Sequence, residues 1–414
     1  MEDRLTTPPG STILLISKVR CALNSAIPAK GDVRMSGVIV HEWIDSTGGS
    51  EKVLDAMFEA FPDANIHCLW NDAPGRFPES RVTETWLSRT PLRRWKAVAL
   101  LFMPGTWRRL RSQASYNWML VSSHLFAHHA QFPGNGKGMR KLVYVHTPAR
   151  YIWVPELDSR GANPVARILS PLLRFLDKRR AQDPACEFAA NSKFVQERIA
   201  ATWQRPSRVI YPPVDVTSIQ SVPCWRDKLT KDELEIFDAL PARFVLGASR
   251  FIPYKKLDMV IKAGNEAGVP VVIAGAGPEE QALRTLAAES RVDVFFVIRP
   301  STQLLYALYQ KASAFIFPPV EDFGIMPVEA MAAGLPVIAN AEGGASESVR
   351  DGETGYLIEN ISVTGIANAI TEISRIDRNR VREGAVAFSR ERFLREVQDW
   401  VNEGPKATEF THSH

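Results

Sequence analysis

Two series of short apolar runs, each run followed by an amphipathic stretch, constrain the fold of this chain more than any other sequence feature. Alternation of buried strands with helical patterns is typical of parallel sheets covered by helices. A segment rich in proline, Tyr211–Asp215, separates the two series. The predicted strands are residues 38–41, 65–69, 118–122, 141–146 and 187–191 in the first series, and 244–248, 269–274, 292–297, 314–318 and 335–339 in the second. We therefore predict an α/β protein with two Rossmann-like domains.

Composition excludes several classes of protein. Of the 414 residues, 45% are hydrophobic and 23% are charged, which is typical of a globular protein and not of a disordered or fibrous one. The 50 basic and 46 acidic side chains leave a net charge of +4, too small over this length to indicate nucleic-acid binding. The four cysteines form no Cys-x-x-Cys pair, so we predict neither a zinc ribbon nor a disulfide framework and favour a reducing cytoplasm.

We expect neither a membrane-spanning helix nor a secretory signal in this chain. The longest apolar candidate, residues 97–103, is shorter than the ~18 to 20 residues that a spanning helix needs. The apolar stretch 13–16 follows two acidic residues and is broken by Lys18 and Arg20, which does not match a secretory signal. Residues 1–34 lack clear periodicity and are predicted to be an N-terminal extension, with Met35 as an alternative start of the chain.

The most informative stretch of the second series is Glu-Asp-Phe-Gly-Ile-Met-Pro-Val-Glu, residues 321–329. Gly324 permits close backbone approach after a predicted strand, and Pro327 suits the first turn of a helix, so Glu329 falls near that helix start. Free amides there can hold a phosphate or a hydroxyl-rich ligand, and the two carboxylates can accept hydrogen bonds from sugar hydroxyls. A solvated helix start with capping acids is the alternative interpretation.

Two further loops carry groups suited to anions. Arg250 and Lys255 lie five residues apart after the first strand of the second series, where both cations can reach one diphosphate. Gly48 and Gly49 join the first strand of the chain to its helix, and paired glycines let backbone amides face a ligand. Ser50 is placed to cap that helix. For each loop, a solvated turn without a ligand is the alternative.

Together these motifs resemble those of retaining GT-B glycosyltransferases of glycosyltransferase family 4, and most closely bacterial exopolysaccharide or O-antigen mannosyltransferases. The resemblance rests on E-D-F-G-x-x-P-x-E-A-M-A-x-G-x-P-V, which contains the E-x7-E signature, on V-H-E-W-I-D-x-x-G-G-S-E-K-V, and on Y-V-H-T-P-x-R-Y-I-W. It covers residues 37–401 and implies a GT-B fold with the active site between the two domains. Ser249 and Lys256 replace the two glycines of the related G-R-x-x-x-x-K-G motif, but both of its cations are present.

The resemblance implies a role for each motif residue. Glu321 would lie beside the donor sugar, and Glu329 would bind the nucleotide ribose. Arg250 and Lys255 would stabilise the leaving diphosphate. The further residues implied to contact the donor are Gly48, Gly49, Phe323, Gly324, Ile325 and, near the base and ribose, Gly344.

Two histidines lie at the ends of predicted strands of the first series. His124 matches a family histidine that faces the donor sugar near its reacting carbon, so we group it with the predicted catalytic residues. His146 is predicted to line the acceptor side, where a neutral imidazole can bind a sugar hydroxyl. A histidine satisfied by neighbours at a strand end is the alternative for both.

We expect no metal ion and no cofactor. His124 and His128 have the i, i+4 spacing of a metal pair, but Leu125 stands where H-E-x-x-H requires glutamate. The sequence contains no Asp-x-Asp triplet, so a metal-diphosphate chelate is not supported. The Gly-Ala-Gly turn at 275–277 lacks the third glycine of a dinucleotide fingerprint.

Residues 89–111 combine many cations with two tryptophans and contain no acid. This composition suits an interfacial helix that binds anionic lipid by charge and inserts aromatic side chains. A core helix with basic ends is an equal alternative. We expect a cytoplasmic protein, with peripheral association at the inner face of the cytoplasmic membrane as an open question.

The predicted function is transfer of a hexose from a nucleotide diphosphate sugar to a lipid-linked or saccharide acceptor in bacterial polysaccharide biosynthesis. By resemblance GDP-mannose is the preferred donor, and UDP-glucose is the leading substitute. The sequence also leaves open a non-catalytic protein that binds nucleotide sugars, and an oxidoreductase. The implied parts are the extension at 1–34, an acceptor domain at 35–215, a nucleotide-sugar domain at 216–387 and a C-terminal helix at 388–414 that crosses back to the acceptor domain.

Overall fold

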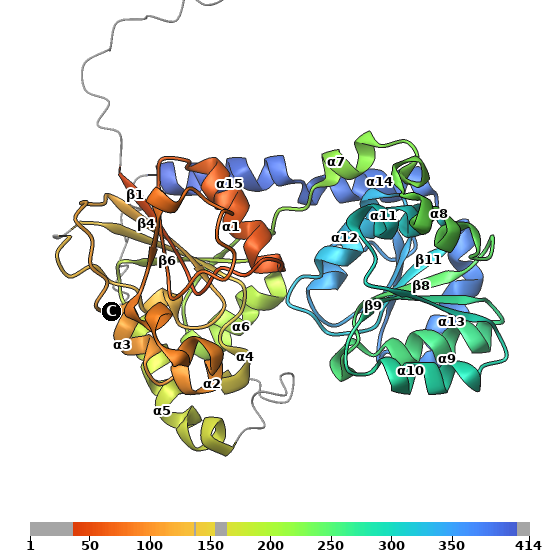
Figure 1. Ribbon diagram of the computed structural model, residues 1–414, viewed down its shortest axis with the longest axis horizontal. Helices are drawn as coiled ribbons and strands as arrows, with labels where there is room; N and C mark the ends of the chain where they lie inside the picture. The colour runs from red at the N-terminus through yellow and green to blue at the C-terminus, as the bar shows by residue number, and fades with distance from the viewer. Residues whose placement is uncertain (1–35, 136–137, 154–163, 404–414) are drawn as a thin grey trace, which may run out of the picture. The chain divides into compact units, whose positions relative to one another are not determined.

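A seven-stranded parallel sheet forms the first half of the protein in the computed structural model, which describes residues 36–135, 138–153 and 164–403 (Figure 1). The strand order is β3-β2-β1-β4-β5-β6-β7. The strands are β1 (Gly37–His41), β2 (Asn65–Cys68), β3 (Val82–Glu84), β4 (Trp118–Ser123), β5 (Arg140–Val145), β6 (Cys186–Ala190) and β7 (Arg208–Val209). The helices of this half are α1 (Gly49–Ala60), α2 (Lys96–Ala99), α3 (Met103–Trp107), α4 (Arg150–Trp153), α5 (Pro164–Ala181) and α6 (Lys193–Trp203).

A six-stranded parallel sheet with the order β10-β9-β8-β11-β12-β13 forms the second half. Its strands are β8 (Val245–Arg250), β9 (Val271–Ala276), β10 (Val294–Ile298), β11 (Ala314–Phe317), β12 (Val337–Asn340) and β13 (Gly355–Ile358). The helices that follow β7 in the chain are α7 (Val216–Ser221), α8 (Lys231–Asp238), α9 (Leu257–Ala267), α10 (Glu280–Ala288), α11 (Thr302–Lys311), α12 (Ile325–Ala332), α13 (Val363–Glu372), α14 (Arg378–Ala385) and α15 (Arg390–Asn402), the last of which packs on the first half. Both sheets belong to one compact unit that begins at Ser36. The predicted α/β fold with two Rossmann-like domains is confirmed.

Helices cover both faces of the first sheet (Figure 1). Val38 and Val40 face one apolar cluster, and Ile39 between them faces the other, because successive side chains of a strand point to opposite faces. Ile199 of α6 belongs to the first cluster and Trp400 of α15 to the second. The central strands are therefore buried on both sides, which is why they read as continuous apolar runs in the sequence.

The last helix, α15, packs against α1 of the first half. Phe393 and Trp400 of α15 are fully buried in the apolar cluster under α1. At the edge of this contact, Arg390 donates to Glu59 Oε2 at 2.6 Å and Gln398 donates to the Ala60 carbonyl at 3.1 Å. The chain thus returns to its first half after it has completed the second.

The predicted interfacial helix at 89–111 is wrong. The segment forms two 3-10 turns, Trp86–Arg89 and Pro91–Arg94, followed by the short helices α2 and α3. Proline lacks the amide that a continuous helix needs, and Pro91 and Pro104 both fall at the starts of new turns. The charged and aromatic side chains therefore extend from a series of short turns and not from one helical face.

Several predictions concern parts of the chain that lie outside the described residues. These are the N-terminal extension at 1–34, the alternative start at Met35 and the last residues of the C-terminal segment, 404–414.

Candidate active site

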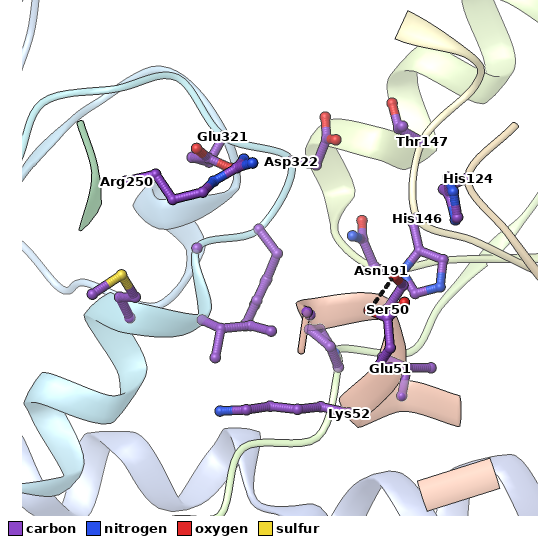
Figure 2. A pocket seen from close by; sticks show the side chains of 18 of the residues that line it. Ser50, Glu51, Lys52, His124, His146, Thr147, Asn191, Arg250, Glu321 and Asp322 are labelled. Carbon is purple, nitrogen blue, oxygen red and sulfur yellow. Dashed lines mark hydrogen bonds between the residues drawn. The ribbon is translucent and has the colours of Figure 1, made fainter. Parts of the chain in front are cut away.

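A cavity of about 1200 Å³ is lined by residues from both halves (Figure 2). Every residue predicted for the site except Gly344 lines it. These residues are Gly48, Gly49, His124, His146, Arg250, Lys255, Glu321, Phe323, Gly324, Ile325 and Glu329. Figure 2 shows Arg250 and Glu321 across the cavity from His124 and His146. Loops that follow parallel strands therefore meet here, as expected at the carboxyl edges of such sheets.

Glu321 lies in the loop between β11 and α12. Its carboxylate accepts a hydrogen bond from Lys255 Nζ, and Arg150 Nη2 lies 4.0 Å from its other oxygen. Gly324 turns the loop into α12 with a φ of +92°, in the left-handed region that favours glycine. Glu321 is thereby held between two cations at the cavity wall.

Glu329 lies one turn into α12 and is buried. Lys52 of α1 donates through Nζ to Glu329 Oε1 at 2.6 Å, so the pair joins the two halves. Burial lowers the pKa of Lys52, but the charge and hydrogen bond of Glu329 outweigh it and raise the pKa above its ordinary value. Lys52 is part of a predicted motif, yet the sequence indicated no role for it, because its partner is 277 positions away.

Arg250 ends β8, and its exposed side chain lines the cavity. Lys255 ends the 3-10 turn Pro253–Lys255 that follows. Lys256 then adopts a φ of +52°, a left-handed conformation that glycine adopts at lower cost. The replacement of glycine by lysine therefore preserves the turn, and both Arg250 and Lys255 remain at the cavity wall.

The Gly48-Gly49 turn lies close to α12 of the second half. A Cβ on Gly49 would lie 3.2 Å from Ile325 Cδ1, and a Cβ on Gly48 would lie 2.0 Å from Glu51 Oε2. Glycine therefore suits both positions, because a larger side chain would come too close to these neighbouring atoms. The predicted cap by Ser50 is wrong, since Gly48 is the N-cap and the Ser50 hydroxyl donates to Glu51 Oε2 at 2.8 Å.

Asp322 has several polar contacts beside the cavity, and the sequence indicated no role for it. Arg150 Nε donates to Asp322 Oδ2 at 2.9 Å, and Arg198 Nη1 donates to Asp322 Oδ1 at 2.7 Å. The Ser192 hydroxyl donates to the Asp322 carbonyl at 2.5 Å. Burial lowers the pKa of Arg150, but the charges of Asp322 and Glu321 raise it above its ordinary value. Asp322 therefore ties the loop that carries Glu321 to the first half.

A buried carboxylate, Glu42, shapes the loop that carries His124. Glu42 Oε1 accepts hydrogen bonds from the amides of Leu125 and Ala127, both at 2.8 Å. Glu42 Oε2 accepts from the His124 amide at 3.3 Å. The His124 ring meets Trp43 edge to face, with 4.7 Å between ring centroids. These contacts hold His124 at the carboxyl end of β4, where it lines the cavity.

Gly344 lies one layer behind the cavity wall. Its amide donates to the Glu321 carbonyl at 2.7 Å, and a Cβ would lie 2.2 Å from the Asp322 carbonyl oxygen. This close approach of two backbone segments requires glycine. Gly344 therefore supports the loop of Glu321 and Asp322.

One group of side chains in the described ranges has ligand atoms close enough to hold a metal ion, and none of its members lines the cavity. Atoms of His128, His129 and Asp177 lie within 4.8 Å of one another, and all three residues are buried. His128 Nε2 lies 3.2 Å from Asp177 Oδ1, whereas His124 faces the cavity. The two histidines with i, i+4 spacing thus belong to different environments.

The architecture is that of the GT-B glycosyltransferases. Residues 235–387 match a family model described as "Glycosyl transferases group 1". The structure of Anabaena HepE in complex with UDP and glucose aligns with a TM-score of 0.64 and 19% identity, over 89% of this chain and 100% of HepE. Sucrose-phosphate synthase from Thermosynechococcus elongatus aligns with a TM-score of 0.66 and 18% identity, over 88% of this chain and 98% of that protein. Both likenesses establish the fold.

A relative with a named activity is the GDP-mannose-dependent α-(1-6)-phosphatidylinositol monomannoside mannosyltransferase of Mycobacterium tuberculosis. It is 32% identical over 213 residues, which are 46% of this chain and 52% of that protein. The chain thus matches about half the length of this relative. The separate family match at 235–387 includes Arg250, Lys255, Glu321 and Glu329.

Proposed function

We propose that this chain is a retaining glycosyltransferase of family 4 that transfers mannose from GDP-mannose to a lipid-linked or saccharide acceptor in polysaccharide biosynthesis. The observation that carries the proposal is the presence of Glu321, Glu329, Arg250 and Lys255 at one cavity. Carboxylates suit the hydroxyls of a sugar and a ribose, and paired cations suit a diphosphate. The named activity of the mycobacterial relative supports the choice of donor.

In the proposed reaction, residues 216–387 bind the donor and residues 35–215 bind the acceptor. The bond between the sugar C1 and the diphosphate oxygen breaks, and a bond from C1 to the acceptor oxygen forms on the same face of the sugar. The leaving phosphate takes the acceptor proton, while Arg250 and Lys255 offset the charge that develops on the diphosphate. Glu321 and His124 lie beside the sugar. No metal ion is needed in this proposal, since the two side chains supply the positive charge.

The donor is tested by the melting temperature of the protein with GDP, UDP, ADP and their sugars. We expect GDP-mannose to stabilise the parent protein by about 2.7 kcal/mol at a hundredfold excess over Kd, because it binds only the folded state. Arg250→Ala is expected to lose this shift. Arg243→Ala, which changes an exposed arginine of the same half outside the cavity, is the matched control and is expected to keep it.

Other outcomes of this experiment would overturn either the proposed donor, the proposed catalysis or the proposed function as a whole. A shift selective for UDP sugars would keep the site and overturn the donor. A GDP-mannose shift without release of GDP in the presence of any acceptor would favour a non-catalytic binding protein. Absence of a shift with every nucleotide would overturn the proposed function, and saturable binding of a nicotinamide cofactor would favour an oxidoreductase.

We also propose an anionic membrane surface as the partner that supplies a lipid-linked acceptor. Exposed apolar side chains lie on two segments of the first half, and they are Trp86, Trp95, Leu101, Phe102, Leu172 and Phe175. Helices α3 and α5 both contact the turn Ala127–His129, and Figure 1 shows them at the same end of the first half. Burial and the nearby charge of Arg108 lower the pKa of Arg180, which indicates that cations of both segments are close. In the part of the chain that the structure describes, no helix has the length and apolarity to cross a bilayer.

Vesicle sedimentation tests this partner. The variant with Trp95→Ala and Phe102→Ala is expected to bind vesicles of phosphatidylglycerol about tenfold more weakly than the parent protein, because aromatic side chains insert at the lipid interface. Ile236→Ala, which removes an exposed apolar side chain from α8, is the control and is expected to bind like the parent. Equal binding of the parent to neutral phosphatidylcholine vesicles, or no loss in the double variant, would contradict this partner.

A further inference from the structure

Four polar side chains form a line behind the cavity wall of the first half. They are Glu51 on α1, His41 at the end of β1, Ser122 on β4 and His146 after β5. Ser122 Oγ lies 3.0 Å from His41 Nδ1 and 2.9 Å from His146 Nε2. His41 Nε2 lies 3.8 Å from Glu51 Oε1. Glu51 and His146 line the cavity, whereas His41 and Ser122 have no exposed surface, so the line runs through the interior from one cavity residue to another.

The sheet itself sets this line. His41 and Ser122 are partners in the parallel pairing of β1 and β4, so their side chains point to the same face of the sheet. Ser122 pairs in turn with Tyr144 of β5, and His146 lies two residues further on, which returns its side chain to that face. The line is therefore built from adjacent strands and does not depend on a loop for its geometry.

The protonation state of Glu51 helps to determine which atoms along this line donate a hydrogen and which accept one. Burial raises the pKa of Glu51, but the neighbouring His41 and the hydroxyl of Ser50 lower it to about 2, so the group is a carboxylate at neutral pH. A carboxylate accepts hydrogen bonds and cannot donate them. The His41 nitrogen that faces this carboxylate, Nε2, therefore carries a hydrogen, and in a neutral His41 ring Nδ1 carries the lone pair.

The hydrogen bonds of Ser122 extend the line from His41 to His146 at the cavity. With His41 neutral, Ser122 donates its hydrogen to His41 Nδ1, so its oxygen accepts from His146 Nε2–H. Burial lowers the pKa of His146 well below its ordinary value, and the neighbouring His124 and His41 lower it further, while Glu51 opposes them. His146 is therefore neutral at pH 7. Its second nitrogen, Nδ1, carries a lone pair, and the ring is only half-buried where it lines the cavity.

We propose that Glu51, a neutral His41 and Ser122 are positioning residues that hold His146 in the Nε2–H tautomer, so that His146 Nδ1 accepts a hydrogen bond from a hydroxyl group of the sugar acceptor. This inference rests on the proposed function, which supplies a ligand rich in hydroxyl donors. The opposite tautomer would present an N–H to the cavity and leave a lone pair facing Ser122. The line thus determines which kind of group, a hydrogen donor, is bound at this point of the cavity.

Nitrogen NMR of the full chain labelled with ¹⁵N-histidine tests the tautomer without reference to activity. The signals of His146 are assigned by their loss in His146→Gln. We expect the parent protein to show a protonated Nε2 and an unprotonated Nδ1 for His146. Glu51→Gln is expected to mix the two tautomers, because an amide can donate as well as accept. Ser122→Ala is expected to change the His146 signals, whereas Ser313→Ala, a partly buried serine bonded to the Phe244 carbonyl, is expected to leave them unchanged.

Acceptor kinetics test the consequence for binding. Ser122→Ala is expected to raise the acceptor KM about tenfold, the effect of one weakened hydrogen bond, while the melting shift with GDP-mannose stays at the parent value. Ser122→Thr keeps the hydroxyl and is expected to restore the parent KM. Unchanged His146 signals in Ser122→Ala, or a rise in the donor KM with an unchanged acceptor KM, would overturn the inference. Failure of the proposed function would look different, since the parent protein would then bind no nucleotide sugar and the NMR result would be unaffected.

Discussion

Replacement of Glu321 by glutamine is expected to lower the rate of sugar transfer at saturating donor by about a thousandfold, since loss of one preorganised charge at a reacting centre has effects of this size. The substitution keeps the shape of the side chain and removes the negative charge that the structure holds between Lys255 and Arg150. That charge faces the cavity where positive charge would develop on the sugar. Initial rates of GDP release from GDP-mannose, with and without acceptor, are the measurement.

Two controls separate this effect from a loss of folding or of donor binding. Glu289→Gln changes an exposed glutamate at the end of α10 and is expected to transfer sugar at the parent rate. The melting shift with GDP-mannose is expected to survive in Glu321→Gln, because Arg250 and Lys255 remain available to the diphosphate of the proposed donor. A fall in rate of less than tenfold would show that Glu321 does not act at the reacting centre.

Strands buried on both faces were predictable because their apolar runs are uninterrupted. The predicted strands of both sheets correspond to β1, β2, β4, β5 and β6 and to β8 through β12. The strands that were not predicted, β3, β7 and β13, have only two to four residues each and lie at sheet edges. Short edge strands lack the continuous apolar pattern of a central strand, so sequence periodicity does not distinguish them from loops.

The site was predictable where a residue's type and its place after a strand carry the chemistry. Glu321, Arg250 and Gly48 are of this kind, and all three line the cavity. The pairing of Lys52 with Glu329 and of Arg150 with Asp322 was not predictable, because the partners are 277 and 172 positions apart. Such pairs form because the two halves contact each other at these residues. A local pattern in a single sequence does not indicate which residues of the two halves will be in contact.

The contacts of the buried line behind the cavity were also not predictable from local sequence patterns, although its residues are closer in the sequence. His41 and Ser122 are 81 positions apart and become neighbours only through the order of strands in the sheet. Each alone is an ordinary polar residue at a strand end. A prediction of strand order that placed β1 beside β4 would have been the signal that brings them together, together with the alternation of side chains along each strand.

Replacement of Asp177 by alanine is expected to destabilise the first half by about 3 to 5 kcal/mol, because it leaves several indole and imidazole groups in the interior without their shared hydrogen-bond acceptor. Asp177 has no exposed surface. Its Oδ2 accepts hydrogen bonds from the indoles of Trp153 and Trp203, both at 2.7 Å, and its Oδ1 lies 3.2 Å from His128 Nε2 and 3.5 Å from His129 Nε2. Urea denaturation followed by circular dichroism at pH 7 is the measurement.

The difference in the free energy of unfolding between the parent protein and Asp177→Ala is expected to become smaller in acid. Burial raises the pKa of Asp177, but His128 and His129 outweigh it and hold the pKa below its ordinary value. A carboxyl group with a lowered folded-state pKa adds stability above its unfolded pKa of about 3.9, and this stability is lost as the pH falls toward the folded value. This difference in unfolding free energy is therefore expected to be constant from pH 7 to pH 5 and to decrease below about pH 4.

Asp238→Ala is the matched control, since it removes the same side chain from an exposed ion pair with Arg226. Exposed pairs are screened by water, so this variant is expected to unfold at the parent urea concentration at every pH. If Asp177→Ala unfolded like Asp238→Ala, the carboxylate would add nothing to the stability of this core. A gap that widened in acid would mean that Asp177 is protonated in the folded protein at neutral pH, which its two indole donors and two imidazole neighbours argue against.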